Sequence, residues 1–153
     1  MYVWTDSLSV GIKEMDDQHR HLFDITNKVF LHMAKRQDER DGSAHTLLDD
    51  IMNYTFYHVR QEEEYMREFS CEDIVHIGMH RWYEHRMKTL FDRASQATRK
   101  GLTDADRACL DLARFTGDWH LAHLQRMDRR YTTCFKEHGL TGAEGEAPQK
   151  IGA

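Results

Sequence analysis

Apolar side chains recur every three to four residues in four long segments of this chain, which is the spacing of amphipathic helices. The first segment ends in the polar run before Gly42, the second near Ser70, the third at Lys100-Gly101 and the fourth near His138. Chain breakers are rare, since the single proline is Pro148 and glycine is sparse before the C-terminal tail. The pattern therefore predicts four long helices rather than many short strands.

The expected start of three of these segments carries a capping signal. Asp16 or Asp17 can cap the first helix, and Ser43 is a plausible N-cap for the second. Thr103 with Asp106 resembles a capping box before the fourth helix, although aspartate replaces the usual glutamate or glutamine. These signals agree with the helix boundaries that the apolar pattern indicates.

The connections between the predicted helices are short, roughly 3–7 residues, which favours antiparallel neighbours. We therefore expect an all-α fold, an antiparallel up-down-up-down four-helix bundle with an N-terminal arm. Residues 1–138 would form one domain, in which residues 1–15 are the arm. Residues 139–153 show no periodicity and are predicted to be a disordered tail.

Composition excludes several classes of protein. With 153 residues, the chain is long enough for one domain with a core of its own. Its formal net charge of -5 argues against nucleic acid or an anionic membrane as the main partner, since both require a basic surface. No apolar run approaches the roughly 18 residues of a membrane-spanning helix, so membrane insertion is not expected.

Three cysteines, Cys71, Cys109 and Cys134, are scattered along the chain without CxxC spacing. Cys109 and Cys134 fall far apart on one predicted helix, so they cannot bridge each other. The N-terminal segment lacks the apolar stretch of a secretory signal. We therefore interpret the cysteines as reduced thiols of a cytoplasmic protein.

Five histidines and two carboxylates on the four predicted helices form a candidate set of metal ligands. They are His19, His58, Glu62, His76, His80, His123 and Asp128. Imidazole nitrogen and carboxylate oxygen suit iron, and two iron ions that share carboxylates require about this many ligands. A hydrolytic zinc site is disfavoured, because seven ligands are too many for one zinc ion and no HExxH motif occurs.

An antiparallel bundle would place all seven residues at one end. The candidates on the first and third helices lie near the start of those helices, and those on the second and fourth lie in the later halves. At a rise of about 1.5 Å per residue, the whole set falls within roughly 20 Å of the same end. A random scatter of histidines would often place one at the wrong end.

The angular positions of the candidates agree less completely. Two i,i+4 pairs, one on the second helix and one on the third, each point to a single side of their helix. His123 and Asp128 are five residues apart, which places them about 140° apart on a regular α-helix. Asp128 would have to reach in from the flank, so spacing alone does not propose this pair.

Four motifs follow one another between residues 4 and 131. They are Trp4 with Ser9–Ile12 and Asp17-Gln18-His19, then Tyr54-x3-His58-x3-Glu62-Glu63-x2-Met66, then His76-x3-His80, and last Trp119-x3-His123-Leu124-x3-Asp128-x2-Tyr131. In this order they resemble the signature of the hemerythrin family, specifically its bacterial single-domain members. Two departures, Val59 in place of the usual phenylalanine and the connection Phe69-Ser70-Cys71, affect pocket shape and loop geometry but no ligand type.

The resemblance implies a cofactor of two iron ions, bridged by carboxylates and by an oxo or hydroxo group. By resemblance, Glu62 and Asp128 bridge the two ions. The same resemblance assigns His76, His80 and His123 to one ion, which is then six-coordinate.

The second ion would be held by His19 and His58 and would keep an open position, at which the family binds O2. The protein would have to surround this position with apolar side chains, because water and protons end reversible binding. By helical register, the candidates for this O2 pocket are Leu22, Phe23, Tyr54, Met66, Tyr83, Trp119 and Met127.

The other six histidines are predicted to lie on the surface. They are His21, His32, His45, His85, His120 and His138. Among them, His85 is the best candidate for a supporting position beside the ligands. In the run Glu62-Glu63-Glu64, only the first residue is expected to point inward.

The resemblance implies reversible O2 binding, for carriage, storage, delivery or sensing, and no enzymatic activity. An oxygen-consuming enzyme could receive the O2, but no sequence feature identifies one. The alternative is a di-iron redox enzyme, such as an oxidase, a peroxidase or a nitric oxide reductase. The chain contains no Glu-x-x-His motif, which argues against a ferritin-like oxidase. A purely structural bundle is the third hypothesis.

Overall fold

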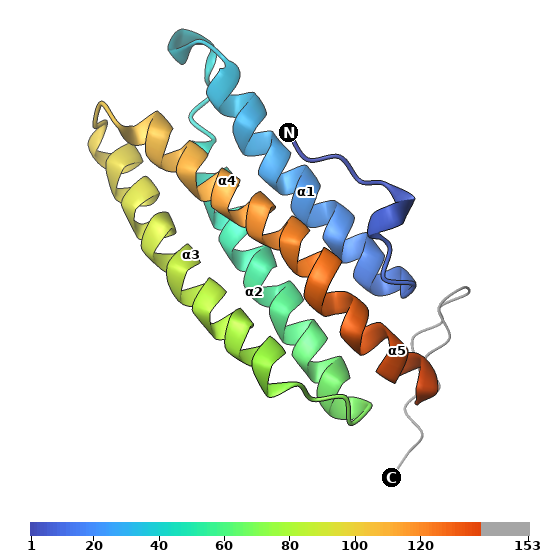
Figure 1. Cartoon of the computed structure of the whole chain (residues 1–153). Helices are drawn as coiled ribbons and strands as arrows, with labels where there is room; N and C mark the ends of the chain where they lie inside the picture. Colours follow the sequence, from blue (N-terminus) through green and yellow to red (C-terminus); the bar gives the residue numbers. More distant parts are fainter. Residues whose placement is uncertain (139–153) are drawn as a thin grey trace.

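A computed structural model, which describes residues 1–138, shows a four-helix bundle (Figure 1). Its helices are α1 (Lys13–Ala34), α2 (Ala44–Glu68), α3 (Ile74–Lys100), α4 (Ala105–His123) and α5 (Arg129–Glu137). A π-helical turn, Leu124–Asp128, joins α4 to α5, so that these two helices together form the fourth rod of the bundle. The predicted tail, residues 139–153, lies outside the described residues.

Each rod of the bundle packs against its two neighbours. Helix α1 contacts α2 and α4, and α3 also contacts α2 and α4. Successive rods run in opposite directions in Figure 1. The predicted all-α, up-down-up-down architecture is therefore confirmed.

Helix α1 starts earlier than the sequence indicated. It begins at Lys13 with Ile12 as the N-cap residue, so the prediction that Asp16 or Asp17 caps it is wrong. The Asp16 carboxylate instead accepts hydrogen bonds from the Val10 backbone N–H (2.8 Å) and the Ser9 hydroxyl (2.5 Å). Asp16 thus ties the N-terminal arm to the first turn of α1.

The remaining helix ends agree with the sequence in part. Ser43 is the N-cap residue of α2, although its side chain makes no capping hydrogen bond. Asp104 stands at the N-cap of α4, and Asp106 is paired with Arg40 at 2.6 Å, so the predicted capping box is wrong. Gly101 ends α3 in the left-handed conformation, at a φ of 60°, as its position after Lys100 predicted.

The N-terminal arm packs along the bundle through Tyr2. The Tyr2 backbone N–H donates to the Asn27 side chain at 2.8 Å, and the Tyr2 hydroxyl donates to Asp118 at 2.6 Å. The Tyr2 ring lies directly over Gly117 of α4, where a Cβ atom would meet ring atoms at 2.0–2.6 Å. A glycine at this position is what allows the arm to approach α4.

Two hydrophobic clusters fill the bundle and leave a polar layer between them. On α2, Ile51 belongs to one cluster and Met66 to the other. His58 and Glu62 lie on the same helix between these two residues. The polar candidates are therefore enclosed by core on both sides along the bundle axis.

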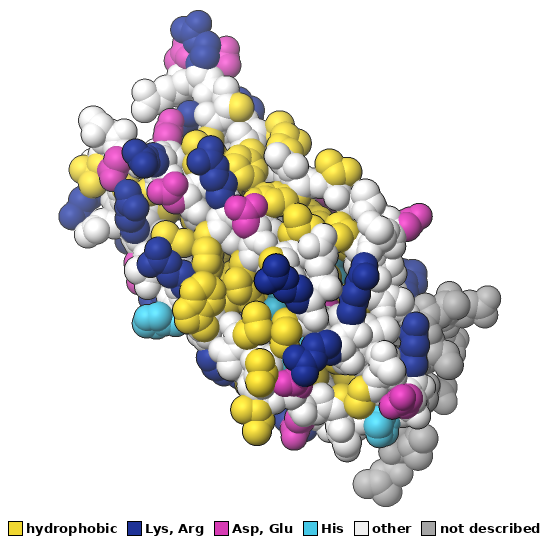
Figure 2. Space-filling view, viewed as in Figure 1, with side chains coloured by type: hydrophobic (Ala, Val, Ile, Leu, Met, Phe, Trp, Pro, Cys, Tyr) yellow, Lys and Arg dark blue, Asp and Glu magenta, His cyan; other side chains and the backbone are white. Residues whose placement is uncertain are grey.

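Hydrophobic side chains gather over α3 and α4 on the face shown in Figure 2, with lysine and arginine side chains among them. Trp82 of α3 is 59% exposed, and its ring centroid lies 6.0 Å from that of Phe115 on α4. Apolar atoms form more than half of most protein surfaces, so this face is not unusual. Among the described helices, none is long and apolar enough to cross a membrane.

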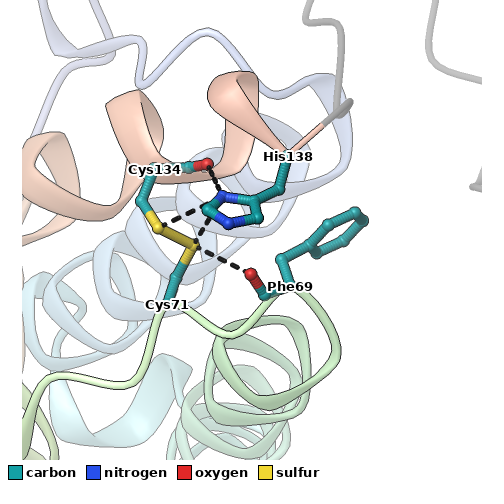
Figure 3. The surroundings of a disulfide bond; sticks show 4 residues. All are labelled: Phe69, Cys71, Cys134 and His138. Atoms are coloured by element: carbon teal, nitrogen blue, oxygen red, sulfur yellow. Dashed lines mark hydrogen bonds between the residues drawn. A yellow bond between two sulfur atoms is a disulfide. The ribbon is translucent and has the colours of Figure 1, made fainter.

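A disulfide bond joins Cys71, in the connection between α2 and α3, to Cys134 of α5 (Figure 3). The His138 imidazole lies beside it, with Nδ1 3.7 Å from the Cys134 sulfur and 3.9 Å from the Cys71 sulfur. The interpretation of all three cysteines as reduced thiols is therefore wrong for this pair. Cys109 is free and buried. The two bonded residues are 63 positions apart, and only the antiparallel packing brings them together.

Candidate metal centre

The structure brings the seven predicted metal ligands into one buried cluster. Each is exposed by 2% or less. One comes from α1, two from α2, two from α3, one from the end of α4 and one from the π-helical turn. We call these seven residues the His/carboxylate cluster.

Glu62 lies in the middle of the cluster with one carboxylate oxygen on each side. Its Oε1 lies 3.1 Å from His58 Nε2 and 3.4 Å from His19 Nε2. Its Oε2 lies 3.2 Å from His80 Nε2 and 3.8 Å from His76 Nε2. The two oxygens of this single side chain therefore face two separate groups of imidazoles.

Asp128 divides its oxygens in the same way. Its Oδ2 lies 3.3 Å from His19 Nε2, and its Oδ1 lies 3.3 Å from His76 Nε2 and 2.9 Å from His123 Nε2. Both carboxylates thus span the same two groups, one with two histidines and one with three. This arrangement is suited to two cations that share both carboxylates.

The three-histidine group is tightly convergent. His123 Nε2 lies 2.7 Å from His76 Nε2 and 3.0 Å from His80 Nε2. A hydrogen bond can satisfy only one such pair at a time, because a neutral imidazole carries a single N–H. Three nitrogens directed at one point suit a shared cation better than they suit each other.

The π-helical turn explains how Asp128 reaches the cluster. In a turn with i→i+5 hydrogen bonds, residues five apart lie above one another instead of about 140° apart. The turn spans Leu124–Asp128, directly after His123. The two residues consequently share a face, and the flank position expected from a regular α-helix is wrong.

Several buried polar atoms of the cluster have no hydrogen-bond partner among the described residues. Four of them face the centre of the cluster: the Nε2 atom of His58, the Oε2 atom of Glu62 and both carboxylate oxygens of Asp128. The Nδ1 atoms of His19, His76 and His123 are also unpaired, but these rings face the centre with Nε2. Buried polar groups are almost always paired, so the unpaired lone pairs at the centre indicate positions for cations. The donor set of nitrogen and oxygen atoms fits iron.

Three residues outside the predicted set support the cluster. Gln18 Oε1 lies 2.8 Å from His58 Nδ1, and Glu63 Oε1 lies 3.0 Å from His80 Nδ1. These contacts place the ring proton on Nδ1 and leave the Nε2 lone pair directed at the centre. The Tyr131 hydroxyl donates to Glu62 Oε1 at 2.9 Å.

Glu63 is 8% exposed, so the prediction that it belongs to a solvated face is wrong. The second motif includes Glu63 and leaves Glu64 variable, and this is the signal that could have indicated its role.

The electrostatics of the cluster favour charge separation between carboxylates and imidazoles. Burial opposes ionisation of Glu62, but the charge of His58 and the hydrogen bond with His19 hold its pKa well below the usual value. Burial also opposes protonation of His19, but its contacts with Asp128 and Glu62 raise its pKa to about 9. The carboxylates therefore remain ionised, and a bound cation would replace protons on the imidazoles.

The seven residues predicted to line the O2 pocket lie in different parts of the structure. Trp119 stacks on His123 at a centroid distance of 4.2 Å, and Tyr83 stacks on Trp119 at 3.7 Å, so both lie at the three-histidine group. Phe23 is buried near Trp4, whereas Tyr54 packs on the exposed His21 at 4.4 Å. The remaining three, Leu22, Met66 and Met127, are buried.

Two of the six histidines predicted to lie on the surface are buried instead. His32 is 5% exposed and His120 is 2% exposed. Burial lowers the pKa of His120 well below its usual value, and the charges of His19 and His58 act in the same direction. His85 is exposed and contacts no member of the cluster among the described residues, so its predicted supporting position is wrong.

The geometry matches a known family. The model of the family described as "Hemerythrin HHE cation binding domain" matches residues 10–134. This chain belongs to the hemerythrin family. The match includes every residue of the His/carboxylate cluster, so the hemerythrin resemblance of the sequence motifs is confirmed.

Curated hemerythrin relatives extend over most of the chain. The bacteriohemerythrin of Clostridium acetobutylicum is 25% identical over 137 residues, covering 86% of this chain and 98% of the relative. The bacteriohemerythrin of Methylococcus capsulatus is 23% identical and covers 88% of this chain and 96% of the relative. A shorter match, 35% identical over 68 residues, is to the bacteriohemerythrin of Stenotrophomonas maltophilia.

A solved structure supports the same fold. It is described as a crystal structure of wild-type hemerythrin and superposes with a TM-score of 0.57, at 22% identity, over 88% of this chain and 98% of its own. At this identity the likeness concerns the fold alone. The bundle of α1–α5 is therefore a hemerythrin bundle.

Proposed function

We propose that this hemerythrin-family protein binds O2 reversibly at a non-haem site of two iron ions. The observation that carries the proposal is the division of both Glu62 and Asp128 between two unequal groups of imidazoles. Three histidines complete one side of the cluster, and two complete the other. With two shared carboxylates and a bridging oxygen atom, the first ion would have six ligands and the second would have five. An exchangeable position would be left at the second ion.

In this proposal, His76, His80 and His123 hold one iron ion, and His19 and His58 hold the other. Once bound, the pair of ferrous ions would supply the two electrons that reversible O2 binding requires. The supporting hydrogen bonds of the cluster would keep the imidazole rings in fixed orientation. The protein therefore presents a rigid, preorganised donor set.

The side chains around the cluster would protect it from water. Leu22 and Phe23, in the turn of α1 that follows His19, are each 2% exposed, and Met66, one turn after Glu62 on α2, is fully buried. A dry site limits access of protons and solvent anions to the open position, which favours release of O2 over oxidation. The composition of this shell supports binding rather than turnover.

The test is an oxygenation cycle followed by absorption spectroscopy. Protein loaded with iron would be assayed for two ions per chain, reduced without oxygen, exposed to air and returned to argon. The proposal expects a nearly colourless reduced form, a visible charge-transfer band in air, and loss of that band under argon. Irreversible passage to a ferric spectrum with release of hydrogen peroxide would favour the redox-enzyme alternative.

Carriage, storage, delivery and sensing all require the same binding step, and an oxygen-consuming enzyme as recipient stays a prediction. A cytoplasmic location also stays a prediction. The Cys71–Cys134 bond bears on it, because stable disulfides are typical of oxidising compartments and cytoplasmic ones commonly respond to redox state. Comparison of the thiol content of protein isolated from whole cells with and without rapid alkylation would test this point.

A further inference from the structure

A further buried histidine, His120, lies beside the two-histidine side of the cluster. It stands on α4 one turn before His123 and is 2% exposed. Its ring centroid lies 5.0 Å from that of His19 and 5.4 Å from that of His58. One nitrogen from each of these three rings lies within 4.8 Å of the others. His120 is thus part of the interior that surrounds the proposed open position.

His120 lies farther from the two carboxylates than the five imidazoles of the cluster do. Each of those five has a nitrogen within 4.0 Å of an oxygen of Glu62 or Asp128. Among the described residues, His120 has no such contact, and it is outside the group in which His19 and His58 approach both carboxylates within 4.8 Å. Donor atoms on one ion, at roughly 2.1 Å from it, lie within about 4.2 Å of one another. Because His120 contacts neither carboxylate, its position fits a place beside the ion better than a place in the ligand set.

One ring nitrogen of His120 makes no hydrogen bond to the described residues. Its Nε2 atom is buried and has no partner among the described residues. The ring of Phe23 meets it edge-on at 5.5 Å, so the surface beside it is apolar. A buried ring nitrogen without a partner is unfavourable, and an unpaired buried polar group in a native protein calls for an explanation such as a bound water, ion or ligand.

We propose that His120 donates a hydrogen bond from Nε2 to a small ligand at the exchangeable position of the ion held by His19 and His58. The inference rests on the proposed function and adds a specificity-determining residue to it. The chemical class of ligand it favours is a small anion, or a diatomic molecule that gains negative charge on binding. A hydrogen-bond donor in a dry pocket stabilises such a ligand and gives little advantage to a neutral apolar one.

The experiment measures azide binding to the ferric, iron-loaded protein by its charge-transfer absorption. Three variants are compared with wild type: His120→Leu, which keeps the apolar volume, His120→Gln, which keeps an N–H donor, and His85→Leu, which removes an exposed histidine elsewhere. All seven cluster residues are intact in the three variants, so each should keep its iron, and iron content is measured to check this. Thermal unfolding establishes that each variant is folded.

We expect two iron ions per chain in every variant. The azide dissociation constant should rise roughly tenfold or more in His120→Leu, since a hydrogen bond to a charged group is lost. His120→Gln should restore part of the affinity, and His85→Leu should match wild type. The azide absorption maximum should also shift in His120→Leu, because the charge on the bound anion is no longer polarised by the donor.

Three results would overturn the inference, and the first of them leaves the proposed function standing. Equal azide affinity in wild type and His120→Leu would show that the imidazole does not contact the ligand. Gain of azide binding in His120→Leu, or loss of one iron ion, would show that His120 is itself a metal ligand. If wild type and His120→Leu both hold two iron ions and neither binds azide, no exchangeable position exists and the proposed function fails as well.

Discussion

The disulfide bond between Cys71 and Cys134 makes a quantitative prediction about stability. The bond closes a loop of 63 positions, from the α2–α3 connection to α5. In the chain-entropy model, a loop of this length removes about 14 cal/mol/K from the unfolded chain, which is about 4 kcal/mol at 25 °C. Measured values commonly fall below this limit, so we expect the double variant Cys71→Ser/Cys134→Ser to lose about 2–4 kcal/mol in free energy of unfolding.

Loss of the disulfide bond should have its largest effect near the metal centre. Helix α5 carries Tyr131, whose hydroxyl donates to Glu62, and it follows directly after Asp128. Without the bond, α5 can separate from the α2–α3 connection at a lower cost in free energy. We therefore expect hydrogen exchange in α5 to accelerate more than exchange in the middle of α2.

The assay is urea unfolding of the oxidised protein, the reduced protein and the double variant. With a denaturant slope of about 1–3 kcal/mol/M, a loss of 3 kcal/mol moves the midpoint by about 1–3 M. Thiol titration after unfolding should find one free thiol in the oxidised protein, that of Cys109, and all three after reduction. Identical midpoints for oxidised and reduced protein, or three free thiols before reduction, would refute the reasoning.

Three further predictions concern the site, a helix cap and the arm. Glu62→Ala should abolish stable binding of both iron ions and destabilise the fold, because buried imidazoles lose their shared partner; wild-type iron content by elemental analysis would contradict this. Asp73→Ala should cost about 1 kcal/mol, since its carboxylate caps α3. Partial burial raises the pKa of Asp73, but backbone hydrogen bonds and the charge of Arg130 hold it below 3.8. The stability that the Asp73 carboxylate contributes is therefore present above that pH and lost on acidification. Urea midpoints of the wild type and of Asp73→Ala, measured between pH 3 and 7, should converge at the acid end. Gly117→Ala should displace Tyr2 and cost about 1–3 kcal/mol, which differential scanning calorimetry would measure, and an unchanged melting temperature would show that the arm does not pack on α4.

Much of the fold could be predicted from local patterns. The apolar stripes of the four segments, with few chain breakers, specify amphipathic helices, and Gly101 marks the end of α3 because glycine adopts a positive φ without strain. The caps were less predictable. Asp16 and Asp106 are common capping residues by type, but tertiary partners, the arm and Arg40, hold them elsewhere.

The buried surroundings of the site were harder to predict than its centre. His120 and Glu63 have the residue types of ordinary surface positions, although His120 stands one turn before His123 and Glu63 belongs to the second motif. Their burial depends on the rotation of α4 and α2 against the neighbouring helices, which a single helix does not encode. The same holds for Cys71 and Cys134, whose pairing requires two segments that are distant along the chain.

The sequence by itself determined which chemistry is available and at which end of the bundle it gathers. Five histidines and two carboxylates at helical spacing, within four helices of alternating direction, suffice for that conclusion because a rise of about 1.5 Å per residue sets their height. Only the tertiary structure decided how the carboxylates divide between two groups of imidazoles and how the π-helical turn brings Asp128 inward. It also placed His120 beside His19 and His58. Height along a helix is a local property, whereas the distance between atoms of different helices is set by the packing of all of them.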